Sequence, residues 1–291
     1  MSIGPVDSAD SADSADSADS AGGAVTVGRS GAARPIGISP SRVLVDGLWW
    51  RGDKWPPSDS PPFPNTTAKQ FPRRAWSSFH YSIATLGEFV QAKLTGAATD
   101  NAWDNITLPA VPSGTALDGE LKELVGLIEY RPYVMSEALA QRDNIVAYWQ
   151  GVLMFNRSSH RFTYDLAQIA VHVGQFQAVH YKDKFQRPRP SQLSPALMPP
   201  IDPPGHAAYP SGHATEAHLL SLCLGSVMPA QAAVPLTRLA ERVARNREVL
   251  GLHYPSDSAA GQQLAQKSFE LLKQCQKFKD LLPLAKQEWA D

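Results

Sequence analysis

The spacing of apolar residues after Phe71 is the feature that most restricts the fold of this 291-residue chain. Apolar side chains recur at intervals of three and four residues, as they do on one face of an α-helix. In the first such stretch the apolar stripe consists of Trp76, Phe79, Ile83, Leu86 and Val90. The spacing predicts helices over residues 75–94, 121–129, 134–155, 162–184, 212–227, 235–250, 256–272 and near 281–289. No convincing alternation typical of a β-strand is found, so we expect an all-α helical bundle.

The chain divides into three parts by composition. Residues 1–30 contain five tandem Asp-Ser-Ala triplets, which offer nothing to bury, and we expect a disordered tail. Residues 31–72 are rich in Pro and Trp and are expected to form an irregular arm, which packs on its own subunit or mediates a homo-oligomer. Residues 73–291 are predicted to be a single helical catalytic domain, with its motif core at 160–270.

Charge and cysteine content exclude several classes of function. The net charge of −1 does not favour a nucleic-acid surface. Two cysteines, Cys223 and Cys275, give no disulfide framework or metal spacing, and a cytoplasmic location is the simplest interpretation. No signal peptide is found, and the most apolar stretch, 217–236, is interrupted by polar residues and Pro229. We therefore expect a protein without a membrane span.

The first of three motifs lies at the end of the helix predicted over 162–184. Lys182 and Arg189 are seven residues apart, which is two turns of a continuous helix. Pro188 and Pro190 prevent continuation, so Arg189 is expected where the chain leaves the helix, directed back toward Lys182. An ammonium and a planar guanidinium both suit a phosphate-like group. The alternative is a solvated helix end, at which basic side chains interact favourably with the helix dipole.

The second motif, at residues 210–213, is expected to begin a helix. Ser211 is a favoured N-cap, and the free backbone N–H groups at a helix N-terminus bind anions. Gly212 lets the backbone approach a ligand closely. His213 adds an imidazole, although Ser211 and His213 could also be an ordinary cap and first-turn residue.

The third motif places Arg247 in the last turn of a predicted helix and His253 in the loop that follows Gly251. Asp257 is close enough to accept a hydrogen bond from the His253 ring, which would fix the tautomer and leave the other ring nitrogen free to attack or to coordinate. The alternative is that Asp257 is only an N-cap and His253 a turn residue.

Together these motifs resemble the pattern K-x6-R-P, P-S-G-H and S-R-x5-H-x3-D. It is shared by the type 2 phosphatidic acid phosphatases, the bacterial non-specific acid phosphatases and the vanadium-dependent haloperoxidases. The resemblance covers about residues 160–270 and departs at Asn246, where the pattern usually has Ser. The matching residues are Lys182, Arg189, Pro190, Pro210, Ser211, Gly212, His213, Arg247, His253 and Asp257.

The resemblance implies a helical bundle with its site at the ends of the central helices. The oxyanion would be bound by Lys182, Arg189, Arg247, Ser211 and the Gly212 amide. In a phosphatase of this family, His253 would attack phosphorus and His213 would protonate the leaving group, without a divalent metal. In a haloperoxidase, His253 would bind the vanadium of vanadate, and Lys182 would polarise bound peroxide.

The surroundings of the second motif resemble the haloperoxidase branch, particularly the bromoperoxidases, in which a His lies seven residues before the motif His. His206 occupies that place, where it could tune halide or peroxide reactivity or simply belong to a loop. We therefore expect a vanadate-dependent haloperoxidase that oxidises halide, bromide by this resemblance, with hydrogen peroxide. The alternative is an acid phosphatase that hydrolyses phosphomonoesters and needs no cofactor.

Two further interpretations are weaker. A non-catalytic phosphate-binding protein would be expected to lack His213 or His253, and both are present. Zinc hydrolysis is disfavoured because the His residues of 206–218 have no recognisable zinc-ligand spacing. Glu216 and His218 are interpreted as residues that line the helix after the second motif.

Overall fold

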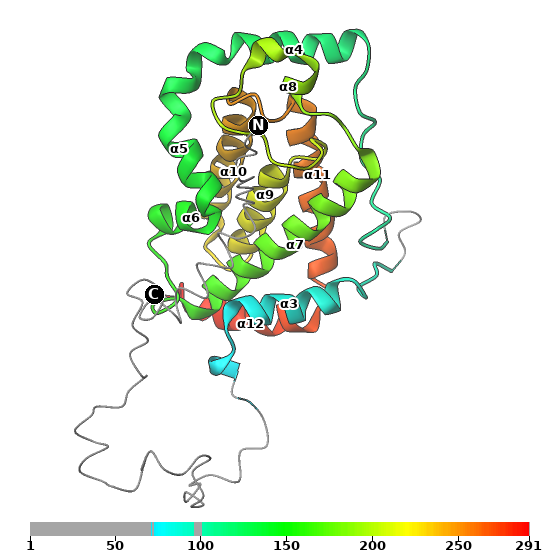
Figure 1. Cartoon of the computed structure of the whole chain (residues 1–291). Helices are drawn as coiled ribbons and strands as arrows, with labels where there is room; N and C mark the ends of the chain where they lie inside the picture. Colours follow the sequence, from blue (N-terminus) through cyan, green and yellow to red (C-terminus); the bar gives the residue numbers. More distant parts are fainter. Residues whose placement is uncertain (1–70, 72, 96–100, 291) are drawn as a thin grey trace, which may run out of the picture. The chain divides into compact units, whose positions relative to one another are not determined.

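Helix α9 (Gly212–Gly225) is the central element of the fold in the computed structural model, which describes residues 71, 73–95 and 101–290. A helix that is buried around most of its circumference needs neighbours on several sides. These are α7 (Arg161–Phe185), α10 (Ala233–Val249) and α11 (Pro255–Leu272), which pack around α9 (Figure 1). The fully buried side chains of α9 include Ala214, Ala217, Leu219, Leu220 and Leu224.

The other helices cover the two ends and one side of this group. Helices α3 and α12 lie at one end of α7, whereas α4 and α8 lie toward the opposite end (Figure 1). All regular elements among the described residues are helical, which confirms the expected fold class. The bounds are α3 Ser78–Phe89, α4 Thr115–Gly126, α5 Arg131–Asp143, α6 Ile145–Leu153, α8 Pro190–Leu193 and α12 Gln276–Gln287, with 3-10 turns η1 Arg73–Ala75, η2 Ile128–Tyr130, η3 Pro195–Leu197 and η4 Ala230–Ala232.

The first helix differs from its prediction. It begins at Ser78, where Ser77 is the N-cap, and the expected apolar stripe is not its buried face, because Ile83 is 44% exposed and Val90 is 37% exposed. The buried face instead contains hydroxyl side chains. Ser82 and Thr85 are fully buried, and each hydroxyl donates to a carbonyl one turn earlier in the same helix. Their polar atoms are thereby satisfied, so this face can pack on α7.

The single helix expected over 134–155 is two helices. The side chain of Asn144 accepts a hydrogen bond from the Ala147 amide at 2.9 Å and caps α6, and α5 ends just before it. Side-chain oxygens of Asn commonly compete with the helix in this way. The last helix also begins earlier than expected, at Gln276, and contains Pro283.

The described residues fall into two compact units. Residues 77–290 lie in one unit, whereas Phe71 and residues 73–76 belong to the other, where the rings of Phe71 and Trp76 meet edge-on with centroids 5.9 Å apart. The predicted tail, 1–30, and nearly all of the predicted arm, 31–72, lie outside the described residues. None of the helices in the described ranges is both long and apolar enough to cross a membrane.

Candidate functional site

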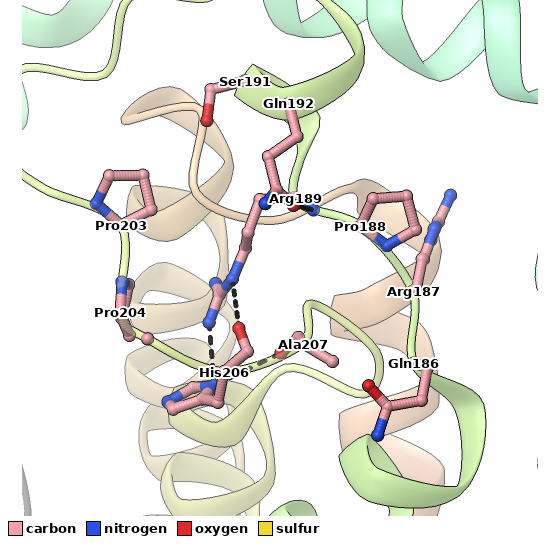
Figure 2. Close-up of a pocket in the computed structure, with 11 residues that line it drawn as sticks. Gln186, Arg187, Pro188, Arg189, Ser191, Gln192, Pro203, Pro204, His206 and Ala207 are labelled. Carbon is pink, nitrogen blue, oxygen red and sulfur yellow. Dashed lines mark hydrogen bonds between the residues drawn. The ribbon is translucent and has the colours of Figure 1, made fainter.

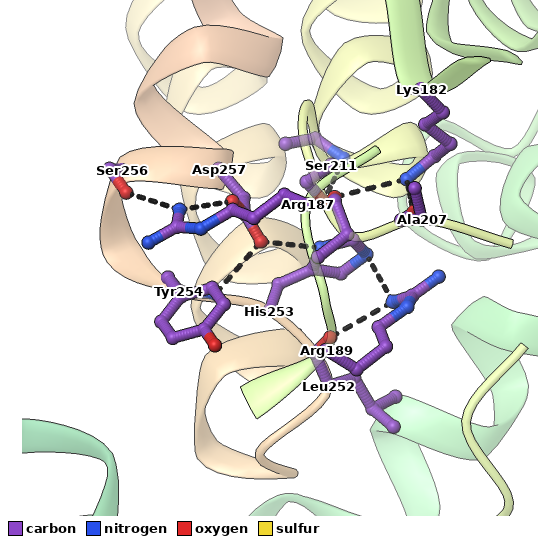
Figure 3. A network of polar contacts seen from close by, with 12 residues as sticks. Lys182, Arg187, Arg189, Ala207, Ser211, Leu252, His253, Tyr254, Ser256 and Asp257 are labelled. Atoms are coloured by element: carbon purple, nitrogen blue, oxygen red, sulfur yellow. Dashed lines mark hydrogen bonds and ion pairs between the residues drawn. The ribbon is translucent and has the colours of Figure 1, made fainter. Parts of the chain in front are cut away.

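The three sequence motifs meet where α7 ends and where α9 and α11 begin (Figure 3). Helix α7 ends because Gln186 adopts a left-handed backbone conformation, with φ of 50°, and is followed by Pro188 and Pro190, which cannot donate a backbone hydrogen bond. The amide of Ser211 donates to the carbonyl of Asp257 at 3.0 Å and so joins the starts of α9 and α11. The three motifs, which are separate in the sequence, therefore lie together and form one site.

Lys182 occupies the last turn of α7 and is almost completely buried, at 3% exposure. Its Nζ donates to the carbonyl oxygens of Ala207 at 2.7 Å and Ala208 at 3.0 Å, in the segment that precedes α9. Burial, and then the charge of Arg189, hold the pKa of Lys182 well below its usual range. Lys182 therefore holds the loop before α9 against α7 and places a positive group at the site.

Arg189 joins two loops through its guanidinium (Figure 2). Its Nε donates to the carbonyl of His206 at 3.0 Å and its Nη2 to Nδ1 of the same residue at 2.9 Å. Its Nη1 donates to the carbonyl of Leu252 at 2.9 Å and to Nε2 of His253 at 3.1 Å. Burial lowers the pKa of Arg189 to about 10, so the group stays charged near neutral pH.

His253 is held between an acceptor, Asp257, which its motif predicted, and a donor, Arg189, which it did not. Its Nδ1 lies 3.0 Å from Oδ2 of Asp257, and its Nε2 faces Arg189. A carboxylate only accepts and a guanidinium only donates, so the ring carries its proton on Nδ1 and a lone pair on Nε2. Asp257 also accepts the Tyr254 amide at 3.0 Å, which places this carboxylate in the first turn of α11.

Arg187 is a site residue that the sequence analysis missed. Its Nη1 donates to Oδ1 of Asp257 at 2.6 Å and to Ser256 Oγ at 2.7 Å, while its Nη2 binds Glu120 of α4 at 2.7 Å. The guanidinium also lies 3.6 Å from the ring centroid of Tyr254. Burial raises the pKa of Asp257, and Arg187 is the main group that opposes this rise. We refer to Glu120, Arg187 and Asp257 as the acidic clamp.

The start of α9 has the geometry expected for a capped helix. The Ser211 hydroxyl accepts a hydrogen bond from the Ala214 amide at 3.3 Å, and Ser211 is fully buried. Gly212 and His213 form the first turn, and the imidazole of His213 has no hydrogen-bond partner among the residues described. Ser211 thus acts as the cap, whereas Gly212 and His213 face the space in front of the helix.

Arg247 is 1% exposed and directed toward α5. Its Nη2 donates to the carbonyl of Ala138 and lies 3.4 Å from Oε1 of Gln141, while its buried Nε has no partner within the described ranges. Asn246, where the resembling pattern has Ser, donates to the same Gln141 oxygen at 3.0 Å. The Asn246 side chain therefore binds α5 and shares the Gln141 oxygen with Arg247.

Two cavities open beside these groups and share Pro204 and His206. The inner cavity has a volume of about 220 Å³ and the outer cavity about 730 Å³. Arg189 and Arg187 line the outer one (Figure 2). The inner cavity is lined by Gln175, Ala178, Val179, Lys182, Pro204, His206, Gly212, His213, Glu216 and His253. Of the motif side chains predicted to act at the site, Ser211, Arg247 and Asp257 line neither cavity, and Arg189 lines only the outer one.

The electrostatics of the inner cavity favour an anion. Burial, then Arg247 and Lys182, hold the pKa of His213 well below its usual range. Burial, then Arg189 and Lys182, have the same effect on the pKa of His253. Both imidazoles are therefore neutral and act as lone-pair donors near neutral pH.

No group of three or more His, Cys, Asp or Glu suited to a metal ion is found in the described part of the chain.

Comparison with known proteins gives a partial similarity. A stretch of 85 residues is 36% identical to the decaprenylphosphoryl-5-phosphoribose phosphatase of Mycobacterium tuberculosis, in strains CDC 1551 / Oshkosh and H37Rv alike. The match covers 29% of this chain and 45% of the relative, so the chain spans less than half the length of the curated relatives it matches. No family model matches the chain. The weak, partial similarity is thus to a phosphatase.

Proposed function

We propose that the chain is a metal-independent phosphatase that hydrolyses phosphate monoesters through a phosphohistidine at His253. The observation that carries the proposal is the imidazole of His253, which is held between Asp257 and Arg189 at the wall of the inner cavity. Lys182 and His213 line the same cavity. The similarity to a named phosphatase supports this choice over the haloperoxidase interpretation, for which no contact described above gives separate support.

The proposed first step transfers the phosphoryl group to the protein. When the phosphate binds, Nη1 of Arg189 exchanges its hydrogen bond to Nε2 of His253 for one to a phosphoryl oxygen, which frees the Nε2 lone pair. Nε2 then attacks phosphorus, the bond from phosphorus to the leaving oxygen breaks, and that oxygen takes a proton from His213. Asp257 stabilises the positive charge that forms on the His253 ring. Lys182, Arg189 and the free amides at the start of α9 bind the phosphoryl oxygens.

The proposed second step returns the protein to its starting state. Water attacks the phosphorus of the phosphohistidine, His213 takes a proton from that water, and the bond between phosphorus and nitrogen breaks to release phosphate. His213 is neutral before substrate binds, because burial and neighbouring cations lower its pKa. A doubly negative phosphate offsets those cations, so substrate binding favours the protonated form that the first step needs.

The proposal is tested with the full chain and two assays. Hydrolysis of an aryl phosphate and bromination of an indicator dye with peroxide are each measured with and without orthovanadate. We expect hydrolysis that vanadate, as a tetrahedral phosphate analogue, inhibits. Bromination that requires vanadate, without hydrolysis in its absence, would contradict the proposal and restore the haloperoxidase interpretation.

A further inference from the structure

Glu216 is an acidic residue inside a cavity that otherwise favours anions. It follows Gly212 by one helical turn and His213 by three residues on α9, so all three face the same side of the helix. It lines the inner cavity together with Lys182 and His253. A carboxylate at this place would repel the oxyanion that the other groups attract.

No residue in the described part of the chain forms a hydrogen bond or ion pair with the Glu216 carboxyl group. Lys182, the nearest candidate by charge, directs its ammonium to the carbonyls of Ala207 and Ala208 instead. Other carboxylates in buried surroundings have direct partners. Glu248, for example, binds Arg245 at 2.6 Å. Glu216 therefore has its hydrogen-bonding capacity available to a ligand in the cavity.

Close packing of α7 fixes the stem of this side chain. A Cβ atom added to Gly174 would lie 3.0 Å from Cα and 3.1 Å from Cγ of Glu216. These distances are tighter than most contacts that Cβ atoms make, so a side chain at position 174 would push Glu216 away by a few tenths of an ångström, and the absence of one allows the two helices to meet here. The carboxyl group is consequently positioned by packing, without a hydrogen bond of its own.

The surroundings of Glu216 favour its neutral form. Burial raises the pKa of Glu216 to about 8, and the charge of Lys182 only partly opposes this rise. The other groups that face the cavity are His213 from α9, His206 from the loop before α9, and His253 from the loop before α11. The Arg189 guanidinium donates hydrogen bonds to the rings of both His206 and His253.

We propose that Glu216 binds the oxyanion as a neutral carboxylic acid, donating its O–H to one of the anion's oxygens, so that anion binding requires a proton on Glu216. The inference rests on the proposed function, because it assumes that the inner cavity binds a phosphate-like dianion. It adds a donor that the three motifs do not contain. The proton remains on the carboxyl group and is shared with the bound oxygen, so no bond is made or broken.

The inference predicts how affinity depends on pH. Sulfate suits the measurement because it stays a dianion throughout, so any pH dependence comes from the protein. If only the protonated form binds, the apparent association constant for sulfate follows the protonated fraction of a group with a pKa of about 8. Sulfate should then bind about tenfold more weakly at about pH 9 than at about pH 7.

The experiment compares the wild-type chain with Glu216→Gln and with Glu248→Gln as a matched control. Glu248 is also buried with a raised pKa, but it pairs with Arg245 outside the cavity. Calorimetry gives the sulfate affinity at the two pH values. Infrared difference spectra at about pH 9 detect the C=O band of a protonated carboxyl group that sulfate induces, a signal that Lys and His cannot produce.

We expect the wild type and Glu248→Gln to show both the tenfold loss of affinity and the sulfate-induced band. Glu216→Gln, which keeps a donor but cannot ionise, should lack the band and bind sulfate at about pH 9 roughly tenfold more tightly than the wild type. Any pH dependence left in that variant belongs to the other groups that line the cavity. Sulfate binding with equal pH dependence in all three proteins, or without the band, would overturn the inference and leave the anion site standing. Failure of the wild type to bind sulfate at either pH would overturn both proposals.

Discussion

Replacement of Arg187 with Met tests whether the acidic clamp holds the catalytic histidine. The Arg187 side chain is 2% exposed, and its guanidinium contacts Asp257, Ser256 and Glu120 at 2.6–2.7 Å. Removing one partner of a buried ion pair leaves an uncompensated charge and typically costs about 3–5 kcal/mol. We expect the free energy of unfolding of Arg187→Met to fall by about that amount. Arg187→Lys should lose less stability than Arg187→Met but still some, because an ammonium keeps the charge and cannot span both carboxylates.

The same substitution should reduce activity through Asp257. Burial favours the neutral form of this carboxyl group, and Arg187 is its main counter-charge. A neutral Asp257 would no longer fix the proton of His253 on Nδ1; a comparable loss of tautomer control in a serine protease triad costs about 10⁴ in kcat. We expect kcat to fall by about 10²–10⁴, with a smaller change in KM, because Arg187 does not line the inner cavity.

Urea unfolding and hydrolysis of an aryl phosphate measure the two effects. Arg238→Met is the control, because its side chain is 76% exposed and pairs with Glu241, whose side chain is itself 44% exposed. Such exposed pairs contribute about 0–1 kcal/mol, so this variant should retain nearly full stability and activity. The reasoning would be refuted if Arg187→Met behaved like Arg238→Met, or if it lost activity only through KM.

Three further predictions concern the packing and titration of the site. His213→Ala should lower kcat/KM, which reports the phosphorylation step, far more for alkyl phosphates than for p-nitrophenyl phosphate, whose leaving group needs little protonation; equal losses in kcat/KM would argue against the acid role. Gly261→Ala should lower the unfolding free energy by about 1–3 kcal/mol and impair activity, because its Cβ would lie 2.8 Å from the Ser211 carbonyl; an unchanged urea midpoint would contradict this. Burial lowers the pKa of His218 to about 4, so wild-type stability should fall as pH drops below about 6.5, where the unfolded chain gains a proton. In His218→Gln the unfolding free energy should fall less steeply with decreasing pH, by about 1.4 kcal/mol per pH unit. If the wild type and the variant gave parallel plots of unfolding free energy against pH, His218 would not be the cause.

The sequence predicted the elements whose signals are local. Helix α7 was predicted to within one residue at each end, because its apolar spacing is uninterrupted until Gln186 and Pro188. The contact of His253 with Asp257 followed from their spacing around a helix start. The buried face of α3 was missed because its hydroxyl groups are satisfied within the helix, which apolar spacing cannot reveal.

The site residues that were missed depend on distant parts of the chain. Arg187 looks like one more basic residue after α7, and its partners Glu120 and Asp257 are 67 and 70 positions away. Glu216 looks like an ordinary helix residue until Gly174 of α7 brings it to the cavity wall. For Arg247, binding of the oxyanion stays a prediction, and the contact that its position in the sequence does not reveal is the one from its Nη2 to the Ala138 carbonyl of α5. Such contacts arise from packing between helices and leave no periodic signal.

The most direct test of the account is to identify the phosphorylated residue during turnover. The full chain is mixed with an aryl phosphate, quenched in alkali, in which phosphohistidine survives, and digested for mass spectrometry. The account predicts one added phosphoryl group on His253, and its absence in His253→Ala together with loss of hydrolysis. Hydrolysis that persists in His253→Ala, or a phosphoryl group carried by another residue, would contradict it.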